Sequence, residues 1–218
     1  MDAGAPPHIK FCGLTNLRDA QLAVEAGAWA LGMILWSGSP RHCDQTEATR
    51  IATAFRRGGP ELVGVFVNPT LDEVAHAADA IGLTMLQLHG DEGPVFCAEA
   101  ARRTGCKVIK AAAVRGNADL QAIEAFHTDF HMLDAHHPEK RGGTGETFDW
   151  ELVAHRRSKI PLVLSGGLTA DNVGAAIAAT HPFAVDVASG TEISPGIKDP
   201  AKLTAFAAAV AASAEVAA

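Results

Sequence analysis

Two residues that could transfer protons each close an apolar, strand-like run of the chain. Cys12 closes the first run, and Asp134 closes the sixth. A thiolate can remove a proton, and a carboxyl group in an apolar pocket can deliver one near neutral pH. A free cysteine is also typical of a buried apolar position, and a strand-end aspartate can cap the next segment. The two residues together suggest general acid–base chemistry.

Two glycine turns follow the last two strand-like runs. Gly166-Gly167 comes after the seventh run, and Ser189-Gly190 comes after the eighth. Such turns can bring bare backbone N–H groups close to a phosphate. In an eight-stranded β/α barrel the catalytic groups stand at the carboxyl ends of the strands, and phosphate usually sits after strands 7 and 8. We therefore predict a phosphorylated substrate.

Three further polar residues occupy similar places. His89 follows the fourth run, Asp186 interrupts the eighth, and Arg41 lies in the loop after the second. We predict that His89 and Asp186 contact the substrate at the mouth of the barrel. Arg41 could hold a substrate carboxylate through its planar guanidinium group. A solvated surface arginine is the alternative reading of Arg41.

A long connection after the sixth run contains three glycines in a short stretch: Gly142, Gly143 and Gly145. It lacks the G-x-x-x-x-G-K-[ST] pattern of a nucleotide-binding loop, so we interpret it as a lid that excludes water. The nearby pair His136-His137 has no further ligand at metal-binding spacing. We therefore expect no metal site.

Eight short apolar runs alternate with eight helical segments. The runs are rich in Val, Ile and Leu, as parallel strands buried on both faces must be. We predict strands at Ile9–Cys12, Ala30–Leu35, Leu62–Val67, Met85–Leu88, Val108–Ala112, Phe130–Asp134, Leu162–Ser165 and Ala184–Ala188. We predict helices at Asn16–Ala26, Gln45–Arg57, Leu71–Ile81, Val95–Thr104, Ala118–Ala125, Asp149–Arg156, Ala170–Ala179 and from Pro200 onward.

This alternation predicts the α/β class and a (β/α)8 TIM barrel. A doubly wound open sheet is the competing architecture, because periodicity alone does not show that the sheet closes. No change in composition marks a linker, so we expect one domain over residues 1–218. Frayed ends are expected at residues 1–7 and about 211–218.

Composition restricts the possible partners. The chain has 218 residues and a formal net charge of −7, with a pI near 5.8, which argues against a nucleic-acid or anionic-membrane surface. No apolar stretch approaches the ~20 residues that span a bilayer. The first ten residues are polar where a signal peptide would be apolar, and the four cysteines show no C-x-x-C spacing. We expect a cytoplasmic protein with reduced thiols.

The ordered set of motifs resembles the phosphoribosylanthranilate isomerase family of tryptophan biosynthesis, from Ile9 to about Phe206. The matching segments are Lys10–Thr15, Ser39–Arg41, Val63–Asn68, Gln87–Glu92, Leu133-Asp134, Gly142–Trp150, Ser165–Leu168, Asp186–Gly190 and Pro195–Asp199. Each segment alone is a weak signal, whereas all of them in this order are specific. Ala188 departs from the family pattern, which usually has a serine there.

The resemblance implies a reaction and roles for its residues. The reaction is an Amadori rearrangement of phosphoribosylanthranilate to 1-(2-carboxyphenylamino)-1-deoxyribulose 5-phosphate, without metal or organic cofactor. It implies that Cys12 is the general base, that Asp134 is the general acid and that Arg41 contacts the anthranilate carboxylate. It also implies that the two glycine turns hold the phosphate. We expect a monomer or a homodimer.

Three alternative functions can be weighed on the same residues. Indole-3-glycerol phosphate synthase, a related barrel lyase, would need lysine and glutamate at the strand ends. The histidine-pathway isomerase performs the same rearrangement with two aspartates, and Cys12 argues against it. A non-catalytic phosphosugar-binding barrel would keep both glycine turns, but would have no reason to keep both Cys12 and Asp134.

Overall fold

The computed structural model of the chain describes residues 5–134, 150–154 and 156–216. The glycines of the predicted lid, Gly142, Gly143 and Gly145, lie outside these described residues. Within them, no helix is long and apolar enough to cross a membrane.

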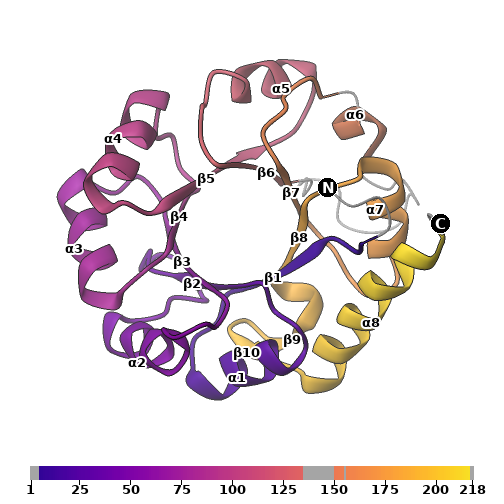
Figure 1. The fold of residues 1–218 in the computed structure, drawn as a ribbon, viewed down its shortest axis with the longest axis horizontal. Helices are drawn as coiled ribbons and strands as arrows, with labels where there is room; N and C mark the ends of the chain where they lie inside the picture. The colour runs from indigo at the N-terminus through magenta and orange to yellow at the C-terminus, as the bar shows by residue number, and fades with distance from the viewer. Residues whose placement is uncertain (1–4, 135–149, 155, 217–218) are drawn as a thin grey trace.

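Eight parallel strands form a closed barrel in which each strand pairs with its neighbour in the chain and β8 pairs with β1 (Figure 1). This closure confirms the predicted TIM barrel and excludes the open doubly wound sheet. The strands are β1 (His8–Cys12), β2 (Ala30–Ile34), β3 (Glu61–Phe66), β4 (Met85–Leu88), β5 (Lys107–Ala113), β6 (Phe130–Asp134), β7 (Leu162–Ser165) and β8 (Ala184–Val187).

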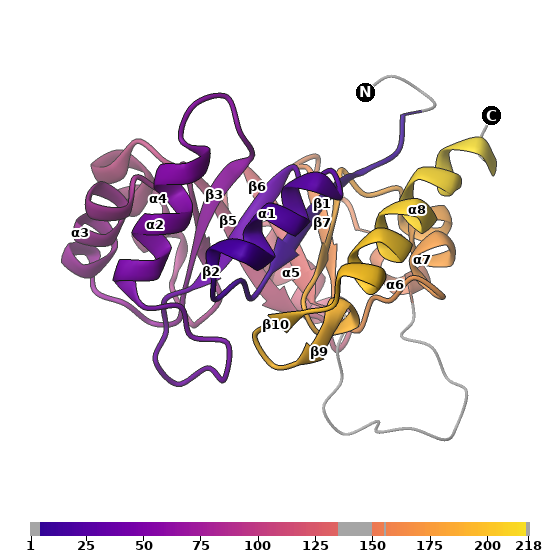
Figure 2. The same cartoon turned by 90° about the horizontal axis from the view of Figure 1, so that it is seen from below.

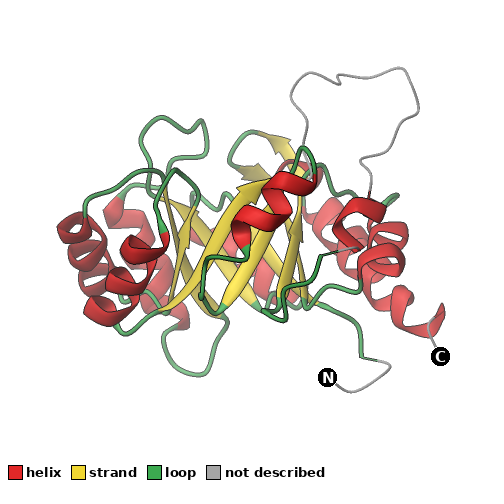
Figure 3. Ribbon diagram, turned by 90° about the horizontal axis from the view of Figure 1, so that it is seen from above, coloured by secondary structure: helices red, strands yellow, loops and turns green. Residues whose placement is uncertain are grey.

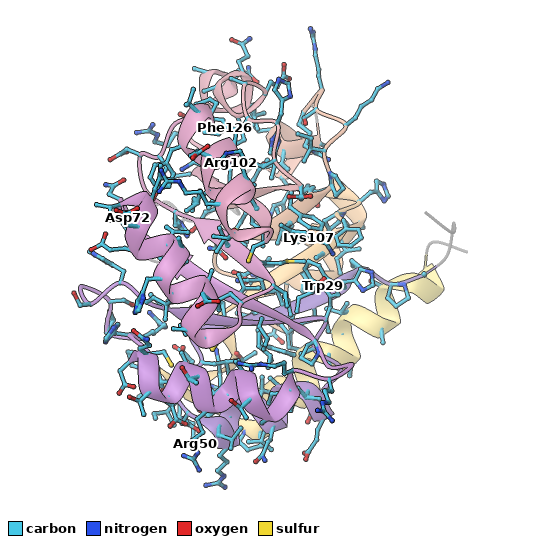
Figure 4. All side chains as sticks on the ribbon, turned by 60° about the vertical axis from the view of Figure 1, so that its left-hand side comes forward. Trp29, Arg50, Asp72, Arg102, Lys107 and Phe126 are labelled. Atoms are coloured by element: carbon cyan, nitrogen blue, oxygen red, sulfur yellow. The ribbon has the colours of Figure 1, made fainter. Side chains whose placement is uncertain are left out.

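Helices surround the barrel as an outer ring (Figure 1). They are α1 (Leu17–Glu25), α2 (Gln45–Phe55), α3 (Leu71–Ile81), α4 (Pro94–Thr104), α5 (Asn117–Ile123), α6 (Trp150–Ala154), α7 (Val173–Thr180) and α8 (Pro200–Val216). Side-chain caps start several of them; the Thr70 hydroxyl and the Glu73 carboxylate form a capping box at α3. Charged residues such as Arg50 and Asp72 project from the outer surface (Figure 4).

Most predicted helix bounds differ from the observed ones by no more than two residues, but the predicted start of α7 is wrong by more. Helix α7 begins at Val173, three residues after the predicted start at Ala170. The Asn172 side chain accepts a hydrogen bond from the Thr169 N–H at 2.8 Å and donates one to the Gly167 carbonyl at 3.0 Å, which holds this stretch as a turn. Helix α8 begins at Pro200 as predicted and continues to Val216, and its alanine-rich sequence has high helix propensity. The expected fraying of residues 211–218 stays a prediction.

A short hairpin between β8 and α8 was not predicted. A single 3₁₀ turn, η1 (Ser189–Thr191), leads into β9 (Glu192–Ser194), which pairs antiparallel with β10 (Ile197–Lys198). The hairpin lies at the end of the barrel opposite the start of β1 (Figures 2 and 3). Pro195-Gly196 makes its turn, with Gly196 at φ +82°, so this dipeptide was the available sequence signal.

Aromatic rings close the opposite, amino-terminal end of the barrel. His8, Trp29, Phe130 and Phe183 pack with ring centroids 4.7–5.6 Å apart, and Trp29 is labelled in Figure 4. Above them lies a layer of small and medium apolar side chains: Ala30, Val63, Met85, Ile109, Met132, Val163 and Ala184. The interior is therefore a packed core at this level, and the buried polar side chains Lys10, Gln87 and Asp186 lie above it, toward the carboxyl ends of the strands.

Candidate active site

Lys10 and Cys12 are neighbours on the inner face of β1, because alternate residues of a strand point to the same side. Lys10 is fully buried, and its Nζ lies 2.5 Å from Oδ1 of Asp186 on β8. The other oxygen of Asp186 accepts a hydrogen bond from the Ser165 hydroxyl at 3.1 Å. The polar centre of the barrel thus combines a buried ion pair with the thiol that closes the first strand.

Gly32 on β2 provides the space for this arrangement. It pairs with Cys12 in the sheet, and a Cβ atom placed on it would lie 2.8 Å from the Cys12 sulfur and 3.0 Å from the Lys10 nitrogen. Both distances are shorter than normal contact, so a larger residue would displace the thiol or the ammonium group. The thiol and the ammonium group therefore converge on one small space.

Opposing effects determine the protonation of Cys12. Burial raises the pKa of the thiol most strongly, and the Asp186 carboxylate raises it further, whereas Lys10 and Lys198 lower it. The net pKa is raised. Burial alone would lower the pKa of Lys10, but Asp186 and Cys12 outweigh it, so that pKa is raised. Lys10 therefore stays charged beside a thiol that is mainly protonated in the free protein.

Asp134 and His89 face one another across the mouth. The His89 Nε2 lies 3.8 Å from Asp134 Oδ2, and both side chains are partly exposed, at 35% and 26%. The Nδ1 of His89 lies 3.0 Å from the Gln87 amide nitrogen, while the Gln87 amide oxygen is buried without a partner among the described residues. Burial lowers the pKa of His89, with Asp134 acting against it. His89 is therefore neutral at neutral pH.

Arg41 does not stand free in solvent. Its Nε donates to both carboxylate oxygens of Glu192, at 2.8 and 3.0 Å, and its Nη2 donates to one of them at 2.8 Å. Glu192 also lies 3.5 Å from the Lys198 nitrogen. Burial acts to raise the pKa of Glu192, but the hydrogen bonds from Arg41 and the charge of Lys198 lower it more. The alternative of a solvated arginine is thus wrong.

The two glycine turns lie side by side after β7 and β8. Gly166 and Gly167 have φ angles of +101° and +62°, which favour glycine. A Cβ atom on Gly190 would lie 2.0 Å from the Leu168 carbonyl oxygen, so the two turns approach too closely for any side chain there. Ser189 is exposed at the start of η1. The predicted phosphate residues are therefore brought together.

The hairpin ties the second glycine turn to the rest of the site. Lys198 Nζ on β10 donates to the Ala188 carbonyl at 2.9 Å and lies 3.2 Å from the Thr191 hydroxyl oxygen. Burial lowers the pKa of Lys198, with Glu192 acting against it. Through Glu192, the same network continues to Arg41. Glu192 and Lys198 were not predicted as site residues, because only the hairpin brings them here.

A second buried ion pair fixes the loop after β4. Lys110 Nζ lies 2.8 Å from Glu92 Oε2 and donates to the Gly90 carbonyl at 2.7 Å. Glu92 also accepts hydrogen bonds from the backbone N–H groups of Asn68 and Gly90, at 2.7 and 2.9 Å. These contacts hold the loop that carries His89.

Not every hollow belongs to the site. A cavity of about 580 Å³ lies between α2 and α3, lined by Trp36, His42, Asn68, Glu73, His76 and neighbouring residues. Cys12 and Asp134 do not line it, so we assign the chemistry to the barrel mouth. In the described part of the chain, no three His, Cys, Asp or Glu side chains are grouped to hold a metal ion.

Comparison with known proteins agrees with this geometry. The family model for N-(5'-phosphoribosyl)anthranilate (PRA) isomerase matches residues 9–209. The N-(5'-phosphoribosyl)anthranilate isomerase of Pelobacter propionicus is 46% identical over 200 residues, which cover 91% of this chain and 92% of the relative.

Solved structures give the same result. The crystal structure of phosphoribosyl anthranilate isomerase from Thermotoga maritima superposes with a TM-score of 0.85 at 38% identity, covering 94% of this chain and 98% of that one. Another structure of the enzyme, in complex with reduced 1-(o-carboxyphenylamino)-1-deoxyribulose 5-phosphate, gives a TM-score of 0.81 at 36% identity with the same coverage. The chain belongs to the N-(5'-phosphoribosyl)anthranilate isomerase family.

Proposed function

We propose that the barrel mouth carries out the isomerisation of phosphoribosylanthranilate in tryptophan biosynthesis with Cys12 as the general base and Asp134 as the general acid. The activity follows from the family. The roles of the two residues rest on one observation: both close strands at the same end of a closed barrel, on its inner face. That end is where this fold places its catalytic groups.

The first step opens the ribose ring. Asp134, in its protonated form, donates a proton to the ring oxygen, and the nitrogen of the substrate forms an iminium group. The neutral His89, 3.8 Å from the carboxyl group, can orient it without adding a positive charge that would favour its ionised form. The substrate supplies its own electron sink, since the iminium group makes the C2′ proton acidic.

The second step removes that proton. Cys12, as the thiolate, takes the C2′ proton, and the resulting enolamine tautomerises to the ketone. Each positioned acid or base typically contributes 10²–10⁴-fold to a rate. Because Cys12 must lose a proton and Asp134 must keep one, we expect a bell-shaped dependence of kcat/KM on pH. The pKa values reported by the acidic and alkaline limbs of this profile belong to Cys12 and Asp134 as a coupled pair, not to either residue alone.

The substrate spans the mouth from Arg41 to the two glycine turns. Glu192 engages Nε and Nη2 of Arg41, so the anthranilate carboxylate would meet the guanidinium group at Nη1. The phosphate would lie against Gly166, Gly167, Ser189 and Gly190. In the structure Asp186 binds Lys10 and Ser165, so its direct contact with substrate stays a prediction.

Two substitutions test the assigned roles. Cys12→Ser should fold normally and lose at least ~10²-fold in kcat, because a hydroxyl group is a far weaker base. Asp134→Asn should abolish turnover while binding of a product analogue is largely kept. Turnover is followed through the loss of anthranilate-type fluorescence from freshly made substrate.

Cys106→Ser provides the matched control. Cys106 is also buried, and its thiol lies 3.2 Å from the Leu83 carbonyl, which a hydroxyl can bond as well. It should therefore retain activity. Near-normal turnover in Cys12→Ser, or an active Asp134→Asn enzyme, would remove that residue from the mechanism.

Function as one domain, assembly as a monomer or a homodimer, and location in the cytoplasm remain predictions.

A further inference from the structure

Lys10 is an unusual group to find inside a barrel. Its side chain has no solvent exposure, and it lies in the strand that carries the base, two residues before Cys12. An isolated buried ammonium group is costly, so it requires partners. One partner is Asp186, at 2.5 Å; the other group that converges on the same space is the Cys12 thiol, next to Gly32.

We propose that Lys10 is a positioning residue for the base, whose ammonium group stabilises the Cys12 thiolate when the C2′ proton is to be taken. This inference rests on the proposed role of Cys12. A thiolate in a buried site needs a nearby cation, and β1 supplies one from Lys10, the inward-facing residue two positions before Cys12 on the same strand.

The other charged groups around Cys12 are less suited to stabilise its thiolate. Asp186 on β8 is negative and opposes the thiolate. Lys198 on β10 is positive, but its nitrogen is bound to the Ala188 carbonyl, Thr191 and Glu192. Arg41, in the loop after β2, is paired with Glu192 through three hydrogen bonds.

The directions of the pKa shifts agree with this geometry. Among the groups that act on Cys12, Lys10 lowers the pKa of the thiol more than Asp186 raises it. Cys12 in turn contributes to the raised pKa of Lys10. The ammonium group therefore interacts with the thiol as well as with its carboxylate partner.

The alternative is that Lys10 only neutralises Asp186. Two variants separate these roles: Lys10→Met removes the cation, and the double variant Lys10→Met/Asp186→Asn removes both charges and should fold better, since no buried charge is left unpaired. The measurement is the titration of Cys12 in the free protein. It is followed by the ultraviolet absorbance of its thiolate as the difference from the same variant carrying Cys12→Ser.

We expect the midpoint of the Cys12 titration to rise by at least about one pH unit in Lys10→Met, as the loss of a nearby opposite charge predicts. In the double variant it should rise by less, because Asp186→Asn also removes a charge that opposes the thiolate. The rate of alkylation by iodoacetamide at fixed pH should fall about tenfold in Lys10→Met. The other thiols, Cys43, Cys97 and Cys106, cancel in both measurements, because each variant is compared with the same variant carrying Cys12→Ser.

Lys110→Met is the matched control, because it also removes a buried ammonium group from its carboxylate partner. It should leave the Cys12 titration unchanged. A double variant whose midpoint returns to that of the unsubstituted protein would show that Lys10 serves only Asp186, and would overturn the proposal; so would an unchanged midpoint in both variants. The titration needs no substrate, so it tests Lys10 separately from the turnover of Cys12→Ser.

Discussion

Glu192 joins the two ends of the substrate site, and its removal should be costly. Its carboxylate accepts three hydrogen bonds from Arg41, lies 3.5 Å from Lys198 and accepts a further bond from the Gly196 N–H at 3.3 Å. The Glu192 side chain is 4% exposed, Lys198 is 0% exposed and Arg41 is 23% exposed. Glu192→Gln keeps the size of the side chain but removes the only carboxylate that the described residues place against both cations.

The expected loss of stability follows from this burial. Breaking a buried ion pair by removing one partner costs about 3–5 kcal/mol, and the amide oxygen of glutamine can keep some of the bonds, so we expect about 3 kcal/mol. For a protein of this size each kcal/mol lowers Tm by about 2–4 °C, which gives a decrease of roughly 6–12 °C.

The stability that the Glu192 carboxylate contributes should depend on pH in a definite direction. Because the folded-state pKa of Glu192 is lowered, the carboxylate contributes stability that is fully present above its unfolded pKa of about 4.3 and is lost as the pH falls through the folded value. The difference between the unsubstituted protein and Glu192→Gln should therefore be largest near neutral pH. It should shrink on acidification below about pH 4.

Thermal and urea unfolding at neutral and acidic pH measure this difference. Glu99→Gln is the control, because Glu99 pairs with Arg102 and Arg103 on the exposed surface of α4, where screening leaves little net stabilisation. A Glu192→Gln protein that unfolds like Glu99→Gln at neutral pH would contradict the stabilisation assigned to Glu192. So would a difference between the unsubstituted protein and Glu192→Gln that grows in acid.

Two glycine substitutions test the positions of loops at the mouth. In Gly190→Ala the new methyl group would lie 2.0 Å from the Leu168 carbonyl oxygen, so KM should rise and inhibition by inorganic sulfate should weaken by at least about tenfold, with kcat less affected. In Gly90→Ala the methyl group would lie 2.2 Å from the Asn68 amide oxygen, so the loop after β4 should shift and kcat/KM should fall. Gly93→Ala, with no atom within 4 Å, should change neither; variants of Gly190 and Gly90 that behave like it would contradict these loop positions.

The sequence predicts the barrel well because each element carries its own signal. Helix α3 matches its predicted bounds, Leu71–Ile81, because Thr70 caps its start and Gly82 ends it at φ +80°. The eight strands were predicted because continuous apolar runs are typical of strands buried on both sides. Helix α7 was placed too early because a single side-chain amide, that of Asn172, closes a turn that competes with the first helical residues.

The predicted site residues were those with a local signal, namely a polar group at a strand end or a glycine turn. Glu192 and Lys198 lack such a signal, because they reach the mouth only through a hairpin that folds back over it. Lys10 is different: it interrupts an apolar run with the same parity as Cys12, so its inward direction was visible in the sequence. What the sequence did not show is its partner Asp186, which lies 176 positions away.

The ion pair of Lys10 and Asp186 raises the question of what keeps it in the barrel interior. Taking two charges out of water costs several kcal/mol for each ion, and well-packed apolar residues of similar volume often replace such a pair without loss of stability. The layer beneath it is already apolar, with Ala30, Met132 and Ala184. Stability alone therefore does not explain the pair, and Lys10→Met/Asp186→Asn should fold about as well as the unsubstituted protein. If that variant is stable but forms the Cys12 thiolate only at a higher pH, the pair serves the chemistry of the mouth and not the stability of the barrel.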